Sequence, residues 1–201
     1  SGRPSAALEV EFLSSLEQGI GEGVDPLAIA DQVARLRSWP PSEKRRLLGG
    51  DWRLRSSDPG DPLVQLGSGL HGLPFVTVQH LFLSLRPVSK ELRTIEILSM
   101  GPAKAVTTIL KGEITYEDDD IVLEYTGMVD KDGFETRSEK KGETRRVTAQ
   151  ALYTGLRSAV FRLKPTSERK GGLLVFERQK DLAAALKEAG GEAVKVLPPV
   201  R

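Results

Sequence analysis

The sequence predicts a mainly β protein with a helical N-terminus, in which about eight antiparallel strands close into a barrel. Three observations predict this α+β fold class. Before residue 50, apolar residues recur at steps of three and four, which is the spacing of amphipathic helices. After Trp52 the period changes to two, which is the spacing of strands. The links between successive strands are mostly short and turn-like, and strands joined without intervening helices favour antiparallel pairing.

Three helices are predicted in the first fifty residues. Residues 6–18 carry apolar side chains at helical spacing with glutamates between them, so the glutamates are expected on a polar face. A second helix is expected to begin at Asp25, because its carboxylate can accept amide protons at a helix start. That helix is expected to end before Pro40, since proline stops a helix. Ser42 is expected to cap a third, short helix.

Eight segments with a period of two are predicted as strands: residues 51–56, 75–86, 92–99, 105–116, 121–129, 144–152, 158–164 and 173–179. Eight strands suit a closed, lipocalin-like barrel, because closure hides the strand edges. We expect residues 1–49 to form a helical segment packed on the barrel, residues 50–180 to form the barrel, and residues 181–201 to form a C-terminal helix and tail. Asp181 is expected to cap this last helix.

Strict alternation also predicts which side chains of segment 75–86 share a face. Phe75, Gln79 and Leu81 are expected on one face, with His80 and Phe82 on the other. Both faces contain apolar residues, so this strand is expected to be covered on both sides over part of its length.

Composition narrows the classes of function. The 201 residues include 29 Lys and Arg and 28 Asp and Glu, which gives a net charge of +1, so strong bulk attraction to nucleic acid is not expected. Aromatic residues make up only 5% and do not alternate with the basic groups, which argues against a base-stacking surface. The absence of cysteine excludes disulfides and thiolate metal sites. The chain opens without Met or a hydrophobic signal core, and is expected to be a mature or trimmed product.

Motifs that would indicate chemistry are weak. Residues 67–72 match the G-x-G-x-x-G pattern, but a strand-like run follows them where a nucleotide site needs a helix, so a flexible loop is expected. His71 and His80 lie on a loop and a strand without helical pairing, and no catalytic constellation accompanies Ser56. The acidic run 117–120 is expected to be a solvated hairpin turn or, alternatively, a site for a hard cation. We therefore predict no metal site and no enzyme, with an isomerase or hydrolase as a remaining alternative.

Basic residues form three groups: Lys44 to Arg46, Lys140 and Lys141 with Arg145 and Arg146, and Arg162 with Lys164, Arg169 and Lys170. Acidic residues interleave with these groups, so a mixed solvated surface is expected. A surface for lipid headgroups or for an acidic partner is the alternative.

Three motifs carry a resemblance to a known family. The segment 47–57 reads LLGGDWRLRSS, the segment 73–82 reads LPFVTVQHLF, and the segment 171–178 reads GGLLVFER. Their order, over residues 25–180, resembles the plastid lipid-associated proteins, also called fibrillins. The additional strand around Phe161, the long loop 164–170 and the alanine-rich final helix depart from the family pattern.

The resemblance implies a non-enzymatic plastid protein that binds or shields a carotenoid, quinone or lipid at the thylakoid or plastoglobule. Such a protein is expected to require no cofactor, and its contact with the membrane is expected to be peripheral. Six residues are the candidates for lining or closing a ligand cavity: Trp52, Phe75, Gln79, Phe82, Tyr125 and Phe161. The alternative is a structural accessory subunit of a photosynthetic membrane complex, such as a photosystem.

Overall fold

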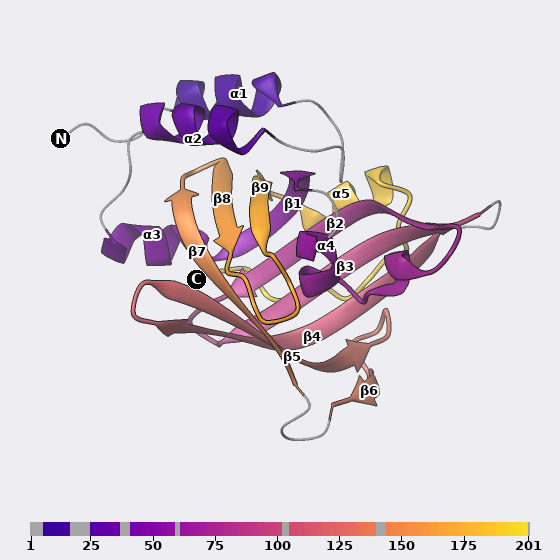
Figure 1. Cartoon of the computed structure of the whole chain (residues 1–201). Helices are drawn as coiled ribbons and strands as arrows, with labels where there is room; N and C mark the ends of the chain where they lie inside the picture. The colour runs from indigo at the N-terminus through magenta and orange to yellow at the C-terminus, as the bar shows by residue number, and fades with distance from the viewer. Residues whose placement is uncertain are drawn as a thin grey trace.

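The computed structural model describes residues 6–16, 25–36, 41–58, 61–101, 105–139 and 144–200. Three helices precede the first strand: α1 (Ala6–Ser15), α2 (Pro26–Arg35) and α3 (Pro41–Leu48) (Figure 1). The strands are β1 (Gly50–Ser57), β2 (Val76–Arg86), β3 (Glu91–Met100), β4 (Val106–Glu117), β5 (Asp120–Val129), β6 (Glu135–Ser138), β7 (Arg145–Thr154), β8 (Ser158–Leu163) and β9 (Gly172–Gln179). Helix α4 (Asp61–Leu66) and the 3-10 helix η1 (Leu70–Gly72) connect β1 to β2, and α5 (Leu182–Glu188) follows β9.

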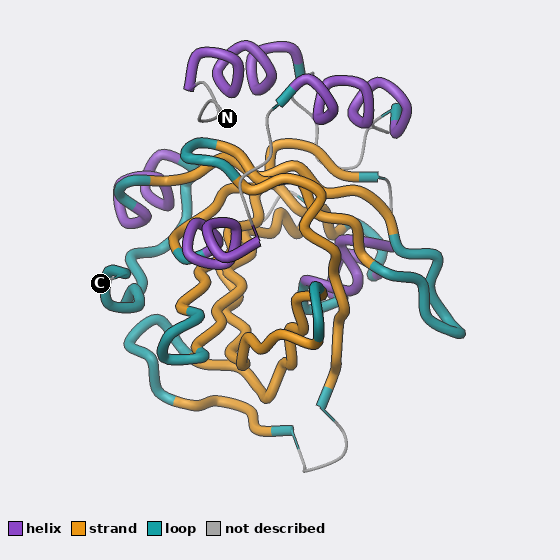
Figure 2. The backbone as a smooth tube through the Cα atoms, turned by 90° about the vertical axis from the view of Figure 1, so that its left-hand side faces the viewer, coloured by secondary structure: helices purple, strands orange, loops and turns teal. Residues whose placement is uncertain are grey.

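Eight of these strands close into an antiparallel barrel. Around the ring the order is β1-β2-β3-β4-β5-β7-β8-β9, and β9 pairs with β1 to close it. Figure 2 shows the strands as a ring, with the first two helices lying outside it. The predicted mainly β fold, a closed antiparallel barrel of eight strands with N-terminal helices, is confirmed. Asp181 caps α5 as predicted, because its side chain accepts a hydrogen bond from the Ala184 amide at 3.0 Å.

Three short elements escaped the sequence prediction. Helix α4 has only six residues and η1 only three, too few to show a helical period. Strand β6 pairs with the end of β5, and its four residues are all exposed, so they show no alternation between apolar and polar side chains. No helix among the described residues is long and apolar enough to cross a membrane.

The barrel interior is filled by side chains from all eight strands of the ring. Trp52 is completely buried there, and its indole nitrogen donates to the Leu48 carbonyl at 3.0 Å. Phe161 and Phe176 pack with ring centroids 5.6 Å apart. Filling of this kind is what a barrel of eight strands allows, since its interior is just wide enough for side chains.

The outer surface of the barrel is covered on two sides. Helices α1 and α2 pack against the outside of β7, β8 and β9 through a cluster that includes Phe12, Ile29 and Val175. Helix α5 packs against β2, β3 and β4 through a cluster that includes Leu186 and Ile97. Both coverings explain why strands of this barrel carry apolar residues on both faces.

A β-bulge in β2 corrects the predicted facing of this strand. The register slips between Val78 and His80, so that Val78 lies opposite Leu98 and His80 opposite Ile97. Gln79 is the extra residue, and Val78 therefore joins the inward face with Leu81. Strict alternation had placed Gln79 on that face; a bulge adds one residue and reverses the facing of everything before it.

The barrel has two distinct ends. The turns β2–β3, β4–β5 and β7–β8 lie at the end closed by α3, which we call the α3 end. The start of β2 and the end of β3 lie at the opposite end with α4 and η1, which we call the α4 end.

Candidate functional site

A cavity of about 180 Å³ opens at the α3 end, between α3 and strands β4, β5 and β7. We call it the mouth pocket. Its lining is Arg45, Leu48, Tyr116, Asp119, Ile121, Gln150, Ala151 and Thr154. Leu48 and Ile121 belong to the barrel core, and Ala151 packs against it, so the floor of the pocket is apolar.

Local strand geometry turns two hydroxyl side chains toward this pocket. Tyr116 lies two residues after the core residue Ile114 on β4 and shares its inward face. On β7 the register shifts between Ala151 and Tyr153, so Tyr153 packs outside against α1 while Thr154 lies opposite the core residue Ala159. The bulge is therefore what brings Thr154 to the mouth.

Both hydroxyls lack a partner. The Tyr116 hydroxyl and Thr154 Oγ1 are buried and form no hydrogen bond within the described part of the chain, and Thr154 is only 1% exposed. The Arg45 guanidinium lies 5.1 Å from the centroid of the Tyr116 ring and donates to the Asp118 carbonyl at 2.6 Å. A small apolar pocket with a few convergent polar groups is the usual form of a small-molecule site.

Burial raises the pKa of Tyr116, and the nearby positive charge of Arg45 opposes this with a smaller effect. The phenol is therefore neutral at physiological pH. It carries a proton that it can donate to a ligand.

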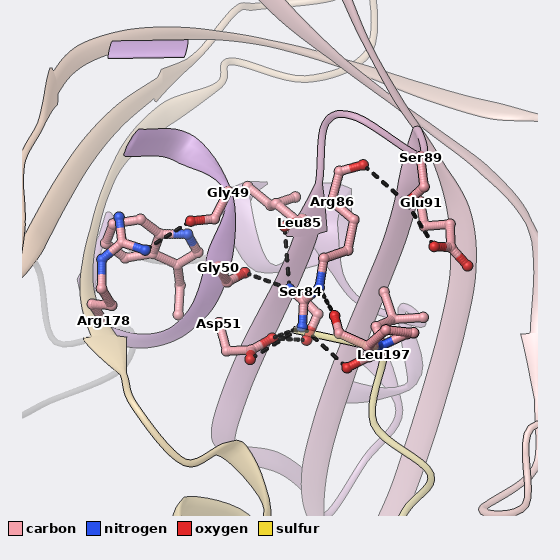
Figure 3. Close-up of polar contacts among 12 residues, drawn as sticks. Gly49, Gly50, Asp51, Ser84, Leu85, Arg86, Ser89, Glu91, Arg178 and Leu197 are labelled. Atoms are coloured by element: carbon pink, nitrogen blue, oxygen red, sulfur yellow. Dashed lines mark hydrogen bonds and ion pairs between the residues drawn. The ribbon is translucent and has the colours of Figure 1, made fainter. Parts of the chain in front are cut away.

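Arg178 holds α3 across the mouth (Figure 3). Its guanidinium lies 4.1 Å from the centroid of the Trp52 ring and donates to the carbonyls of Leu47 and Gly49, the latter at 2.7 Å. A cation at the C-terminal end of a helix is favourable, because the last carbonyls are unpaired there. Gly50 makes room for this contact: its φ is +138°, and a Cβ atom there would lie 2.3 Å from the guanidinium.

The second arginine of Figure 3, Arg86, anchors the C-terminal tail. It pairs with Asp51 at 3.1 Å and donates to the carbonyls of Gly50 and Leu197 at 3.1 and 3.3 Å. Leu197 is buried, so the tail packs onto the barrel at this point.

A second polar feature lies inside the barrel toward the α4 end. We call it the inner polar cluster; its members are Thr94, Glu96, Thr108, Tyr125 and Arg145. Glu96 is completely buried, and its Oε2 accepts hydrogen bonds from Thr108 Oγ1 and from the Ser68 amide, both at 2.9 Å. The Tyr125 hydroxyl and Thr94 Oγ1 are 2.8 Å apart. The Arg145 guanidinium lies 4.5 Å from the centroid of the Tyr125 ring.

Burial dominates the electrostatics of this cluster. It raises the pKa of Tyr125 to about 12. It also lowers the pKa of Arg145, against opposing effects of Tyr125, Glu96 and Glu139. Arg145 donates to the Val64 carbonyl at 3.1 Å, while its Nε and Nη2 and Glu96 Oε1 have no partner within the described residues.

The glycine-rich segment 67–72 contacts this cluster. It follows α4, its last three residues form η1, and β2 comes next in place of the longer helix that a nucleotide site needs. The Ser68 amide of the loop donates to the Glu96 carboxylate. A Cβ atom at Gly67 would lie 1.9 Å from Glu96 Oε1, so glycine is required there by close packing.

The six predicted lining residues do not form one site. Trp52, Tyr125 and Phe161 lie in the barrel core. Phe82 was predicted to line a cavity, but it lies on the outer face under α5. Gln79 is exposed at the bulge, and Phe75 is 87% exposed in the loop before β2. None of the six lines the mouth pocket.

The exposed position of Phe75 can be tested by substitution. It has a φ of +65°, which is unfavourable for a bulky residue and costs glycine little. Because the ring is exposed, little packing is lost on its removal. We expect Phe75→Gly to raise the free energy of unfolding by about 0.5–1 kcal/mol, measured by urea denaturation. A loss of stability would show instead that the ring packs against the barrel.

Several residues of these two features were missed or misplaced by sequence reasoning. Arg145 was grouped with the surface basic residues Lys140, Lys141 and Arg146, but its guanidinium points into the barrel. The inward facing of Tyr116 could be predicted from alternation, because Tyr116 lies two residues after Ile114. The inward facing of Thr154 could not be predicted, because the bulge precedes it.

Other motifs take the places expected of structural residues. The acidic run forms the β4–β5 hairpin turn, with Glu117 paired to Arg146 and Asp120 paired to Lys164. His80 lies on the outer face of β2 near Arg53; burial lowers its pKa, as does the Arg53 charge, so it is neutral at pH 7.

The sequence matches no protein-family model and no curated protein. The barrel, its mouth pocket and the chemistry of their side chains therefore carry the functional argument.

Proposed function

We propose that the protein is a non-enzymatic binding protein that takes one end of a hydrophobic molecule into the mouth pocket. The observation that carries this proposal is an apolar-floored cavity at the barrel mouth that contains two buried hydroxyls without partners. The family resemblance supports a carotenoid, quinone or lipid as the ligand, and a plastid as the location.

Only one end of such a molecule fits. The cavity of about 180 Å³ is smaller than the 300–1,000 Å³ typical of sites for drug-sized ligands, and the core beneath it is filled by side chains such as Trp52 and Phe161. A ring or head group therefore enters the pocket, while the remainder of the ligand stays outside the barrel.

The energetics favour a lipid environment for this binding. A ring that buries about 150 Å² of apolar surface gains about 4 kcal/mol at 25 cal/mol per Å², and association costs consume much of this gain. A gain of this size corresponds at best to a millimolar dissociation constant. The pocket would thus be occupied where the ligand is locally concentrated, which supports peripheral contact with a thylakoid or plastoglobule surface.

The proposal is tested by measuring ligand binding before and after a substitution fills the mouth pocket. We expect ultrafiltration of the protein at equilibrium with a micellar thylakoid lipid extract at millimolar concentration to recover an excess of a carotenoid, quinone or lipid with the protein; the free ligand must stay present, because a millimolar complex dissociates when it is removed. Ala151→Phe should abolish recovery, because Ala151 lines the pocket. Val106→Phe is the control, since Val106 is 37% exposed on β4, near its start at the α4 end. Equal recovery from both variants, or none from the unchanged protein, would contradict the proposal.

A structural accessory subunit of a photosynthetic membrane complex, such as a photosystem, is the second candidate. The packed barrel interior favours it, and so do large apolar side chains exposed on loops: Phe75, Val88 and Phe134 are 87%, 91% and 72% exposed. Comigration with a large complex in gently solubilised thylakoid membranes would support this function. Migration only as a free monomer would argue against it.

A further inference from the structure

We propose that the mouth pocket recognises a ring carbonyl, with Tyr116 and Thr154 donating hydrogen bonds to its oxygen. This inference rests on the proposed function, because it concerns the same pocket and specifies the class of ligand. It adds a requirement that hydrophobicity alone does not impose, namely an uncharged hydrogen-bond acceptor on the group that enters.

The first step of the argument is the state of the two hydroxyls. Both are withdrawn from water and form no hydrogen bond within the described residues. A buried polar group of a native protein almost always has a partner. Thr154 is almost completely buried, with 1% of its surface exposed, and it lines the cavity together with Tyr116. A ligand in the pocket is the available partner for both.

The second step is the polarity of the missing partner. Both hydroxyls can donate, and the phenol of Tyr116 remains protonated because burial raises its pKa. The Arg45 guanidinium lies over the Tyr116 ring and adds positive potential at the same place. These groups favour an acceptor, and a carbonyl oxygen can accept two hydrogen bonds through its two lone pairs.

The third step separates a carbonyl from a carboxylate. Arg45 is already engaged with the Asp118 carbonyl at 2.6 Å, and Asp119 lines the same pocket. Because the opposite charges of Arg45 and Asp119 both border the pocket, an anion gains little net attraction there, and it would lose its hydration against the apolar floor. A neutral carbonyl avoids this desolvation penalty.

The fourth step is size and shape. Leu48, Ile121 and Ala151 supply apolar walls, and the cavity of about 180 Å³ is of the size of one substituted six-membered ring. The ligand class is therefore a carbonyl-bearing ring, which a quinone and a keto-substituted terpenoid ring share.

The experiment compares duroquinone with durene, its hydrocarbon counterpart without the carbonyls, by NMR titration of the whole chain. We expect duroquinone to bind about tenfold more tightly than durene. Tyr116→Phe and Thr154→Val should each reduce this preference about threefold, and the double variant should abolish it. Durene binding should stay within twofold in all of them, which shows that the pocket still folds. Thr115→Val is the control, because Thr115 is the neighbour of Tyr116 on β4 and alternation turns it to the other face of the sheet.

The outcomes separate this inference from the proposed function. Equal affinity for duroquinone and durene would overturn carbonyl recognition and leave a hydrophobic pocket in place. Failure of both probes to bind would overturn the proposed function as well. Tighter binding of 2,4,6-trimethylbenzoate than of duroquinone would show an anion site and overturn the inference. Isophorone, a trimethyl cyclohexenone, separates the sources: a preference shared with it supports a keto ring, and one limited to duroquinone supports a quinone.

Discussion

Glu9→Ala is expected to lower the free energy of unfolding by about 3–4 kcal/mol and to release α1 from the barrel. Glu9 is completely buried, although the spacing of the apolar residues places it on the polar face of α1. Its carboxylate accepts hydrogen bonds from the Tyr153 hydroxyl at 3.0 Å and from the amides of Leu156, Arg157 and Ser158 at 3.1, 2.5 and 2.9 Å. Alanine would leave these donors, which lie at the β7–β8 turn, without a protein partner.

Urea denaturation measures the stability loss, and hydrogen exchange shows where it arises. The amides of residues 156–158 and of α1 should lose protection in Glu9→Ala, while those of β3 and β4 keep it. Glu11→Ala is the matched control, because Glu11 lies on the same helix and is exposed. Equal stability of the two variants would show that the Glu9 contacts do not hold α1.

Glu9 also illustrates a limit of prediction from the sequence. The spacing of apolar residues correctly predicted helix α1, and it placed the glutamates on the polar face; Glu9 is the exception, since its partners lie 144 or more residues away on the β7–β8 hairpin. Local periodicity contains no information about such a distant partner. The eight barrel strands, in contrast, were predictable, because one buried face imposes a period of two on each strand.

The candidate site also contains residues that local periodicity predicts and residues that it does not predict. The inward facing of Tyr125 and Phe161 follows from alternation alone, and both lie in the core. Phe82 was wrongly expected to line a cavity, because α5 covers it from outside. Thr154 lies after the predicted strand 144–152, so no facing was predicted for it, and a bulge turns it inward. A bulge is one extra residue in a pairing, so it becomes visible only once the partner strand and its register are known.

The inner polar cluster yields the second large effect. We expect Glu96→Leu to lower the free energy of unfolding by about 3–5 kcal/mol, because it leaves the largely buried Arg145 charge without its buried counter-charge. Arg145→Met should cost a similar amount for the converse reason. No hydrogen bond joins the two side chains among the described residues, yet Glu96 raises the pKa of Arg145 through its charge. Their coupling is therefore electrostatic and acts through the low-dielectric interior.

A double-mutant cycle measures this coupling. Glu96→Leu combined with Arg145→Met should cost at least 2 kcal/mol less than the sum of the two single changes, since the pair of apolar side chains leaves no buried charge behind. Leu98→Ala combined with Arg145→Met is a control, because Leu98 is a buried aliphatic residue on the same strand and carries no charge. Additive costs in both cycles would mean that the charges of Glu96 and Arg145 are each stabilised by hydrogen bonds with other groups, such as the Ser68 amide and the Val64 carbonyl, and are independent of each other.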